Sequence, residues 1–293
     1  MTSRQPVRVT DRLSPSEVDD VLALAAAAGH LDGVYPLSED VVLRVRGDVS
    51  GQGRHLLAYA GDRLAGYAFV EGSSGELIVH PGFRRAGVGT GLLAAAGPGP
   101  LRFWAHGDDP GAAAFASRNG FERARVLWQM RRSLLEPLPD IPLPEGVTVR
   151  GFRPGSDEQA WLEVNAKAFA HHPEQGRWTL PDLLTREDEP WFDPAGFLLA
   201  VDITGTVLGF HWTKVHPASG DEPAVGEIYV LGVDPSGHRR GLGAALSVAG
   251  LRHLAGAGLT VSSLYVDESN TAAVKLYRRL GFEVYKTDVN YRR

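Results

Sequence analysis

The sequence predicts an α/β protein built from two tandem domains, each with a mixed sheet flanked by helices. The first observation is that nearly the same phrase occurs once in each half of the chain, opening at Val79 and again at Val233. Each copy follows an alternating apolar run, which favours a strand, and precedes a run rich in Ala and Leu, which favours a helix. The second observation is that 293 residues are enough for two domains of ordinary size.

The repeated phrase combines a valine, a proline, an arginine pair and a Gly-x-Gly. It reads VHPGFRRAGVG from Val79 and VDPSGHRRGLG from Val233. A glycine turn that opens a helix presents unpaired backbone N–H groups and the positive helix end to an anion. A helix start with solvated arginines is the alternative for either copy alone, but the repetition favours phosphate binding. The spacing fits neither a P-loop nor a dinucleotide fingerprint.

Caps, alternation and Gly/Pro breaks predict the elements of the first domain, residues 1–133. Ser14 and Glu17 form a capping box, with Pro15 at the first helical position, so a helix should run from there to Ala28. The elements expected after it are strands at 55–60, 64–70 and 76–80, a helix at 87–96, a strand at 101–105, a helix at 110–118 and closing strands from 120 to 132.

The order of elements restarts after a proline-rich segment. Residues 134–145 carry four prolines and predict an extended linker. In the second domain, 146–293, Ser156 and Gln159 predict a second capping box, and 171–193 has no counterpart in the first half. The other expected elements are strands at 147–152, 197–202, 207–216 and 226–233, a helix at 241–257, a strand at 262–266 and a helix at 271–280.

Composition argues against several classes of function. A formal net charge of −5 does not suit a dedicated nucleic-acid binder. No apolar run is long enough to cross a bilayer, and residues 1–6 lack the apolar core of a signal peptide. The absence of Cys removes disulfides and Cys-ligated metal, and His171 and His172 lack a third ligand at a suitable spacing. We therefore expect a cytoplasmic protein without nucleic-acid, membrane or metal partners. A monomer is the expected oligomeric state, although composition does not determine it.

The motifs of the second half resemble the GNAT superfamily of N-acetyltransferases. A strand ending in Val-x-Pro and the glycine turn are followed by Asn270, Ala273, Tyr277 and a Gly-Phe pair, while His238 replaces the usual Gln or Arg. The resemblance implies two tandem GNAT domains, each with a mixed, mostly antiparallel twisted sheet flanked by helices. It also implies acetyl-CoA as cosubstrate.

Longer phrases resemble the mycothiol synthases, a family of tandem acetyltransferases from actinobacteria, over almost the whole chain. They are GFHWTKVHP from Gly209, GEIYVLGVDP from Gly226, FWAHG from Phe103, QMRR from Gln129 and HPEQG from His172. The resemblance implies transfer of acetyl from acetyl-CoA to the cysteinyl amine of 1D-myo-inositol 2-(L-cysteinylamino)-2-deoxy-α-D-glucopyranoside, the final step of mycothiol biosynthesis. Two alternatives stay open: another amine acceptor, such as an aminoglycoside or a protein N-terminus, and a non-catalytic acyl-CoA-binding module.

The resemblance places the CoA pyrophosphate on the second-half turn, where Gly241 and Gly243 let the backbone approach it closely. The strand end at 231–233 would pair with the pantetheine arm and turn an N–H toward the thioester carbonyl. The expected cofactor-binding residues are Leu231, Gly232, Val233, His238, Arg239, Arg240, Gly241, Leu242, Gly243, Ala244, Tyr265, Asn270, Thr271, Ala272, Ala273, Val274 and Lys275 in the second half, and Leu77, Ile78, Val79, Arg84, Arg85, Ala86, Gly87, Val88 and Gly89 in the first.

Glu227 is the expected general base. The strand period places it on one face with Tyr229, Leu231 and Val233, and a carboxylate on such an apolar face is costly without a partner or a task. The resemblance assigns it removal of a proton from the amine, through water. The alternative for Glu227 alone is a solvated side chain at a strand end.

Tyr277 is the expected general acid, which protonates the departing thiolate. For an isolated tyrosine on an amphipathic helix, a core position is the alternative. Aligning the Gly-Phe pairs of the two halves places Ala116 opposite Tyr277 and Asp109 opposite Asn270. The first half lacks the acid, so we expect it to be non-catalytic although it can still hold a CoA.

For the acceptor amine, the resemblance selects Glu39, Glu174, Lys214 and Glu227. Carboxylates suit its ammonium group, and Lys214 would face sugar or inositol hydroxyls. Because Glu39 comes from the first half, the acceptor pocket is expected between the domains. Taken alone, each of these residues is an ordinary surface charge.

Overall fold

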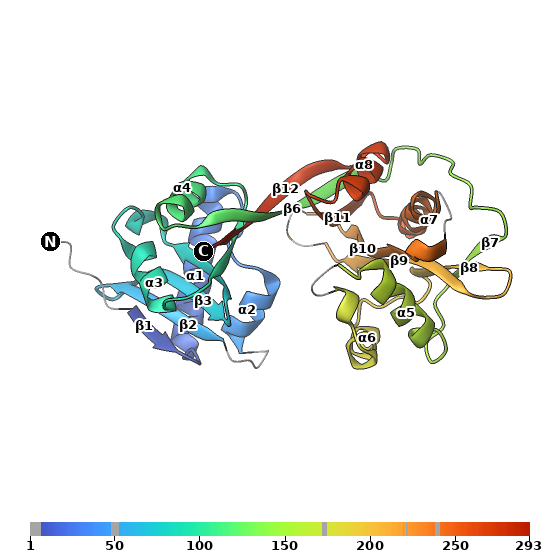
Figure 1. The fold of residues 1–293 in the computed structure, drawn as a ribbon. Coiled ribbons are helices and arrows are strands. Elements are labelled where there is room, and N and C mark those ends of the chain that lie inside the picture. Colours follow the sequence, from blue (N-terminus) through green and yellow to red (C-terminus); the bar gives the residue numbers. More distant parts are fainter. Residues whose placement is uncertain (1–6, 48–52, 172–174, 219, 221, 238–240) are drawn as a thin grey trace. The chain divides into compact units, whose positions relative to one another are not determined.

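The computed structural model describes residues 7–47, 53–171, 175–218, 220, 222–237 and 241–293 (Figure 1). The chain forms two compact units. Unit 1 comprises Met1–Trp128, Asp267–Ser269 and Lys286–Arg293, and unit 2 comprises Gln129–Val266 and Asn270–Tyr285. These units follow the two halves of the sequence except at strands β6 (Glu122–Ser133), β11 (Val261–Asp267) and β12 (Glu283–Arg292), each of which begins in one unit and ends in the other, and at residues 268–269, which belong to unit 1.

Unit 1 contains a mixed sheet in the order β1-β2-β3-β4-β5-β12. Its remaining strands are β1 (Val7–Thr10), β2 (Arg54–Ala60), β3 (Arg63–Glu71), β4 (Ser74–Val79) and β5 (Arg102–His106). Neighbours are antiparallel except β4 and β5, which are parallel. The expected mixed, mostly antiparallel sheet is therefore confirmed in this unit.

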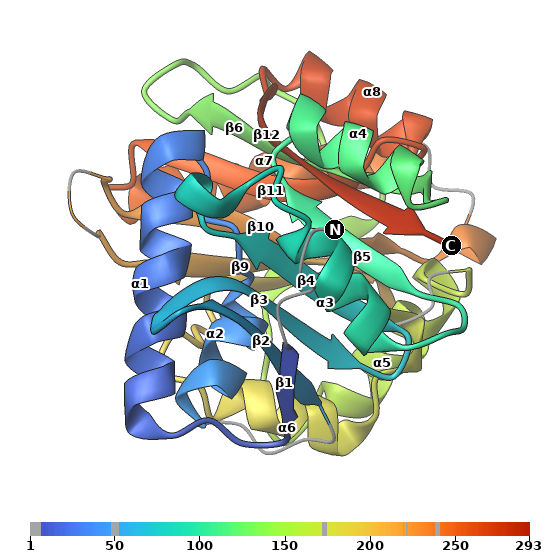
Figure 2. The same ribbon diagram turned by 90° about the vertical axis from the view of Figure 1, so that its left-hand side faces the viewer.

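Helices cover both faces of the unit 1 sheet. Figure 2 shows α1 (Pro15–Asp32) on one side of β2–β4 and α3 (Val88–Ala96) on the other. The predicted capping box of α1 is present: Ser14 Oγ accepts from the Glu17 N–H, and the Glu17 carboxylate accepts from the Ser14 N–H. Two further helices are α2 (Glu39–Arg46), which the sequence pattern did not predict, and α4 (Pro110–Arg118), and the short 3-10 helix η1 (Pro81–Phe83) precedes α3.

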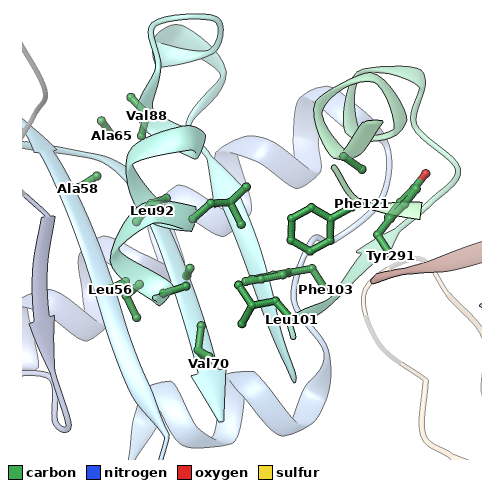
Figure 3. Packing of buried hydrophobic residues seen from close by; sticks show 14 of the residues in the cluster. Leu56, Ala58, Ala65, Val70, Val88, Leu92, Leu101, Phe103, Phe121 and Tyr291 are labelled. Carbon is green, nitrogen blue, oxygen red and sulfur yellow. The ribbon is translucent and has the colours of Figure 1, made fainter. Parts of the chain in front are cut away.

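The last residues of the sequence belong to the core of unit 1. Val289 and Tyr291 of β12 are buried in the cluster that contains Leu92, Phe103 and Phe121, and Figure 3 shows Tyr291 beside the two phenylalanines. Residues 288–292 pair antiparallel with β5 over its whole length. Unit 1 thus takes one inner strand from the far end of the sequence.

Unit 2 repeats the architecture, with strand order β11-β10-β9-β8-β7. The strands are β7 (Val147–Gly151), β8 (Phe197–Asp202), β9 (Val207–His216), β10 (Val225–Val233) and β11 (Val261–Asp267). Only β10 and β11 run parallel. The helices are α5 (Glu158–Ala168), α6 (Leu180–Glu187), α7 (Leu242–Gly256) and α8 (Thr271–Arg279), and the 3-10 helices are η2 (Gln175–Arg177) and η3 (Pro235–Gly237).

The start of α5 differs from the prediction. Asp157, not Ser156, is the N-cap residue, and its side chain makes no capping bond. The Asp157 carboxylate instead accepts two hydrogen bonds from Arg150, at 2.6 and 2.8 Å, and one from the Arg153 N–H. The predicted capping box at Ser156 is therefore wrong, because a nearby arginine engages the carboxylate and fixes the turn.

The proline-rich segment 134–145 has no regular secondary structure. Two hydrogen bonds hold it to neighbouring elements: the Leu134 N–H donates to the Thr260 carbonyl, and Arg252 of α7 donates to Asp140 at 3.0 Å. Across the described residues, no helix combines the length and apolarity needed to traverse a membrane.

Candidate active site

The two glycine turns have the same backbone geometry. Gly87 has φ 85° and ψ −1°, and Gly241 has φ 87° and ψ −10°. Each is the N-cap of a helix, α3 or α7, and no side chain caps either helix. Such left-handed conformations suit glycine, and the uncapped N–H groups remain able to bind an anion. The expected contacts of His238, Arg239 and Arg240 lie outside the described residues.

The parallel strands separate beside these turns. β10 pairs with β11 only from Val225 to Ile228, and β4 pairs with β5 only from Ser74 to Glu76. Further along, 231–233 and 77–79 pair with the antiparallel neighbour alone, as far as the described residues show. One backbone edge of each expected pantetheine strand is therefore open to a ligand that carries amide groups.

A β-bulge in β10 changes which side chains accompany Glu227. The register shifts between Ile228 and Val230, so that Glu227 lies opposite Lys214 but Leu231 lies opposite His211. Opposed residues of an antiparallel pair share a face, and faces alternate along each strand. The prediction that Glu227 shares a face with Leu231 and Val233 is therefore wrong, because the extra residue of the bulge inverts the alternation.

The two faces of β10 pack against different helices. Leu231 and Val233 pack with Leu242 and Leu246 of α7. Tyr229 instead belongs to the aromatic cluster on the opposite face, the face that carries Glu227. The side chains of the expected pantetheine strand thus fill the core, while the candidate base and its neighbours lie on the face covered by α5 and α6.

Glu227 is buried and directly paired with a histidine that the sequence analysis did not select. Its Oε2 lies 2.6 Å from Nε2 of His216 at the end of β9. Lys214, directly opposite Glu227, holds its ammonium group 4.7 Å from the ring centroid of Trp191 and 5.6 Å from that of Tyr229. The site therefore combines a buried carboxylate, an imidazole and a cation held by cation–π contacts.

Aromatic rings form the wall around this cation. Trp212 stacks on Phe197 with centroids 4.2 Å apart, and Trp191 meets Tyr229 edge-on at 5.1 Å. Arg186 of α6 donates to the Tyr229 hydroxyl at 3.2 Å. The stretch 171–193, which has no counterpart in the first half, supplies Trp191 and Arg186 to this wall. The sequence signal was available, since four of the six tryptophans lie between 161 and 212.

Tyr277 is buried on α8, edge-on to Phe282 at a centroid distance of 5.8 Å. Burial raises the pKa of its phenol to about 12. Within the described part of the chain, its hydroxyl has no hydrogen-bond partner. The phenol therefore stays protonated near neutral pH and keeps its donor free.

The expected cofactor residues of α8 surround the start of that helix. Asn270 is the N-cap, and its side chain accepts from the Ala273 N–H at 3.2 Å. Asp109 does the same for Ala112 at the start of α4, at 2.7 Å. Tyr265 is half exposed on β11. The first turn of α8, residues 271–275, lies next to the cap, and its predicted contact with the cofactor stays a prediction.

Unit 1 contains a cavity of about 790 Å³ beside its own glycine turn. Arg84 at its rim donates two hydrogen bonds to Asp32, at 2.8 and 2.6 Å, and this carboxylate raises the pKa of the guanidinium. Arg85 takes a left-handed conformation, φ 63°. Of the residues expected to bind CoA in this half, the cavity is lined by Leu77, Ile78, Val79, Arg84, Arg85, Gly87, Val88 and Gly89.

His106 on the cavity wall carries two carboxylate partners. Its Nε2 lies 3.4 Å from Glu76, and its Nδ1 lies 3.3 Å from Asp288 of β12. Burial opposes protonation, but the nearby carboxylates of Asp288 and Glu76 outweigh it and raise the pKa of His106 to about 9. Glu76 also accepts from the Ser38 N–H, at 2.9 Å. Sequence reasoning missed this cluster, which joins β4, β5 and β12.

The expected acceptor residues are distributed over both units. Glu39 is the exposed first residue of α2 in unit 1, whereas Lys214 and Glu227 belong to unit 2. Glu174 lies outside the described residues. Among those that are described, no three His, Asp or Glu side chains are grouped to hold a metal ion. The shared acceptor pocket stays a prediction.

Comparison with known proteins assigns the family. The model of the acetyltransferase (GNAT) family matches residues 160–282. The chain is 56% identical to a mycothiol acetyltransferase of Salinispora arenicola over 100% of both chains. The chain belongs to the mycothiol acetyltransferase family. A relative of the same name from Thermobispora bispora is also 56% identical, over 98% of this chain and 99% of the relative.

Solved structures agree with a mycothiol acetyltransferase built from tandem GNAT domains. A GCN5-related N-acetyltransferase from Sphaerobacter thermophilus superposes with a TM-score of 0.73 at 28% identity, covering 99% of this chain and 96% of that one. A tandem GNAT protein from the clavulanic acid biosynthesis pathway, at 20% identity, shares the fold with a TM-score of 0.71 over 98% of both chains. The predicted fold class, family and acetyltransferase activity are thus confirmed.

Proposed function

We propose that unit 2 transfers acetyl from acetyl-CoA to the cysteinyl amine of 1D-myo-inositol 2-(L-cysteinylamino)-2-deoxy-α-D-glucopyranoside, the final step of mycothiol biosynthesis, in a cytoplasmic monomer. Full-length identity above 50% to several mycothiol acetyltransferases supports the substrate pair. The observation that carries the mechanism is the position of Glu227 on β10, at the point where β10 leaves β11. At that point the base lies beside the open backbone edge.

The backbone of unit 2 would bind the elongated acetyl-CoA molecule. The turn at 238–244 would bind the pyrophosphate, since Gly241 holds the loop in a left-handed turn and leaves the first N–H groups of α7 uncapped. The open edge at 231–233 would pair with the pantetheine amides. An N–H of this edge facing the thioester carbonyl would stabilise the negative charge that develops on its oxygen.

Glu227 would remove the proton that the amine must lose when its nitrogen bonds to the acetyl carbon. A free α-amine has a reference pKa of about 7.7–8.0, so a carboxylate acting through one water has a modest task. Burial of Glu227 on an aromatic-lined face supports this role, because such a carboxylate interacts strongly with a nearby ammonium group.

Tyr277 would protonate the departing thiolate. Its pKa of about 12 keeps the phenol in the donor form at neutral pH. The apolar surroundings that raise the pKa of Tyr277 would also raise the pKa of a thiol held beside it. The pKa of the thiol then lies closer to that of the phenol, which favours proton transfer to the thiolate. Breaking the carbon–sulfur bond and protonating the sulfur then release CoA.

The acceptor would bind on the aromatic face of unit 2. Lys214, held over Trp191 and Tyr229, offers ammonium hydrogens to sugar or inositol hydroxyls. Glu39 and Glu174 would add the carboxylates expected for an ammonium-bearing substrate. These three residues are proposed acceptor contacts.

Unit 1 would bind a CoA without catalysing transfer. Its cavity of about 790 Å³ adjoins the glycine turn and the open edge of β4, which supports binding. Ala116 occupies the position on α4 that corresponds to Tyr277, so no phenol is available there to protonate a thiolate. Arg84 is already paired with Asp32, which leaves the backbone of the turn as the main phosphate contact.

An acetyl-transfer assay tests the proposal. The cysteinyl-glucosaminyl-inositol amine is offered beside an aminoglycoside and a peptide N-terminus, with release of free thiol as the readout. We expect kcat/KM to be highest for the cysteinyl amine. Equal or faster turnover of an unrelated amine would refute the substrate assignment, and absence of transfer to any amine would favour a binding module.

A further inference from the structure

His216 is the hydrogen-bonded partner of the candidate base, and none of the roles above uses it. Its Nε2 lies 2.6 Å from Oε2 of Glu227, which is the carboxylate carried by β10. We propose that His216 is a positioning residue for acetyl transfer, which orients the Glu227 carboxylate and conducts its proton to solvent. This inference rests on the proposed role of Glu227 as base.

A proton path to solvent requires a buried base and a more exposed partner, and Glu227 and His216 differ in this way. The Glu227 side chain is 10% exposed and that of His216 is 42% exposed. A buried carboxylic acid exchanges its proton slowly unless a partner connects it to water. Imidazole is the side chain that most readily exchanges protons with water near neutral pH. His216 thus links an enclosed base to the solvent.

The sheet fixes this pair in place. His216 lies opposite Val225, and Lys214 lies opposite Glu227, so all four side chains project from one face of β9 and β10. Lys214 of β9, Tyr229 of β10 and Arg186 of α6 are charged or titratable groups on the same face, and α5 and α6 also carry Glu158 and Glu187. Lys214 is directed over Trp191 and Tyr229, and Arg186 is bonded to the Tyr229 hydroxyl. Within the described residues, the Glu227 carboxylate therefore has His216 as its hydrogen-bond partner.

The proton balance of the reaction requires an exit. An acceptor that arrives as an ammonium ion loses two protons on becoming an amide, while the thiolate takes up one. One proton per turnover must therefore reach solvent. Protonated Glu227 would donate its O–H proton to Nε2 of neutral His216, and the imidazolium would release its Nδ1 proton to water. The first transfer regenerates the Glu227 carboxylate, and proton exchange with water returns His216 from the Nε2–H to the Nδ1–H tautomer.

Three variants test the inference. His216→Ala removes the imidazole, His216→Gln keeps an amide donor that cannot carry a proton, and Glu227→Gln removes the base. His253→Ala is the matched control. His253 lies on α7 and also pairs with a carboxylate, that of Asp193, at 3.2 Å. Each is assayed for kcat and for KM of both substrates from pH 6 to 9, with and without added imidazole.

We expect His216→Ala to lose roughly 10²-fold in kcat, at the low end for a general-base contribution, and to recover activity with added imidazole. His216→Gln should keep KM for both substrates but stay slow, with a changed pH profile of kcat. A fully active His216→Gln variant, or a His216→Ala variant that imidazole does not restore, would overturn proton conduction.

Failure of the inference can be distinguished from failure of the proposed function. If Glu227→Gln retains wild-type kcat, Glu227 is not the base and the mechanism above is refuted. If Glu227→Gln is slow while His216→Ala is unaffected, only the role of His216 is refuted. A Glu227→Gln/His216→Ala double variant no slower than Glu227→Gln would support a residue that acts through the base.

Discussion

Gly87 and Gly241 occupy the same left-handed conformation at the start of equivalent helices, with φ 85° and 87°. Two separate units therefore form the same backbone turn, which we propose binds an anion. Neither position has any atom within 4 Å of where a Cβ would lie, so the need for glycine is conformational and not steric.

Substitution of Gly241 tests this device. Gly241→Ala should destabilise unit 2 by about 1–2 kcal/mol, the cost of a left-handed L-residue, and should raise KM for acetyl-CoA several-fold. Thermal unfolding and steady-state kinetics measure the two effects. Gly256→Ala at the end of α7 is the control, because a Cβ there also meets nothing within 4 Å and the backbone has no positive φ. An effect no larger than that of the control would contradict the assignment.

Removal of the Tyr277 hydroxyl should slow transfer without unfolding the protein. Tyr277→Phe keeps the ring packing against Phe282 and removes the proposed acid, so kcat should fall roughly 10²–10⁴-fold. Tyr285→Phe serves as control, since its hydroxyl bonds to Glu222 on the exposed surface of the same unit. An unchanged rate for Tyr277→Phe would show that the thiolate leaves without a protein acid.

Substitution of Lys214 should change the KM of the amine substrate only. Lys214→Met preserves the length and apolar stem of the side chain but loses the ammonium group above Trp191. KM for the amine should rise roughly tenfold or more, as expected for lost hydrogen bonds to a charged group. KM for acetyl-CoA should not change. A rise in KM for acetyl-CoA instead would place Lys214 on the cofactor side.

His106 should make unit 1 sensitive to alkaline pH. Its pKa in the folded protein, about 9, exceeds the ordinary value of 6.5. The resulting stabilisation is complete below pH 6.5 and is lost as pH rises through 9, with a magnitude of about 3 kcal/mol. Chemical unfolding between pH 6 and 10 measures it. His106→Gln should be less stable at pH 6 and should lose this pH dependence, and a parallel decline in both proteins would contradict the prediction.

The stability of the aromatic cluster of unit 2 should depend on the volume of its rings more than on hydrogen bonds of the indole N–H groups. Trp161 is fully buried, and its Nε1 has no hydrogen-bond partner within the described residues. Trp161→Ala should cost about 3–5 kcal/mol of unfolding free energy, whereas Trp161→Phe should cost clearly less. Denaturant titration compares the two, and equal losses would indicate that the indole N–H is bonded.

The parts of the fold that depend on local sequence were predictable. The Gly241 turn, the strand before it and the helix after it follow from glycine conformation and hydrophobic period, and the capping box at Ser14 follows from side-chain chemistry. Each of these features is decided by residues a few positions apart.

The parts that depend on register or on distant residues were not predictable. One extra residue at Tyr229 inverts the faces of β10, and periodicity alone cannot detect it. The pairs His216–Glu227 and His106–Asp288 form only after strands align, and Asp288 is far from His106 in sequence. The short helix α2 carries too few turns for a periodic signal.

The inclusion of residues 286–293 in unit 1 has a consequence for biosynthesis. A ribosome makes unit 1 almost entirely before unit 2, yet the strand that pairs with β5 and places Val289 and Tyr291 in the core is synthesised after both. The N-terminal half therefore remains incomplete, with β5 unpaired along one edge, until the second half has been translated. The N-terminal half is therefore not a module that could be cut out at the proline segment and expected to fold as it does in the whole chain.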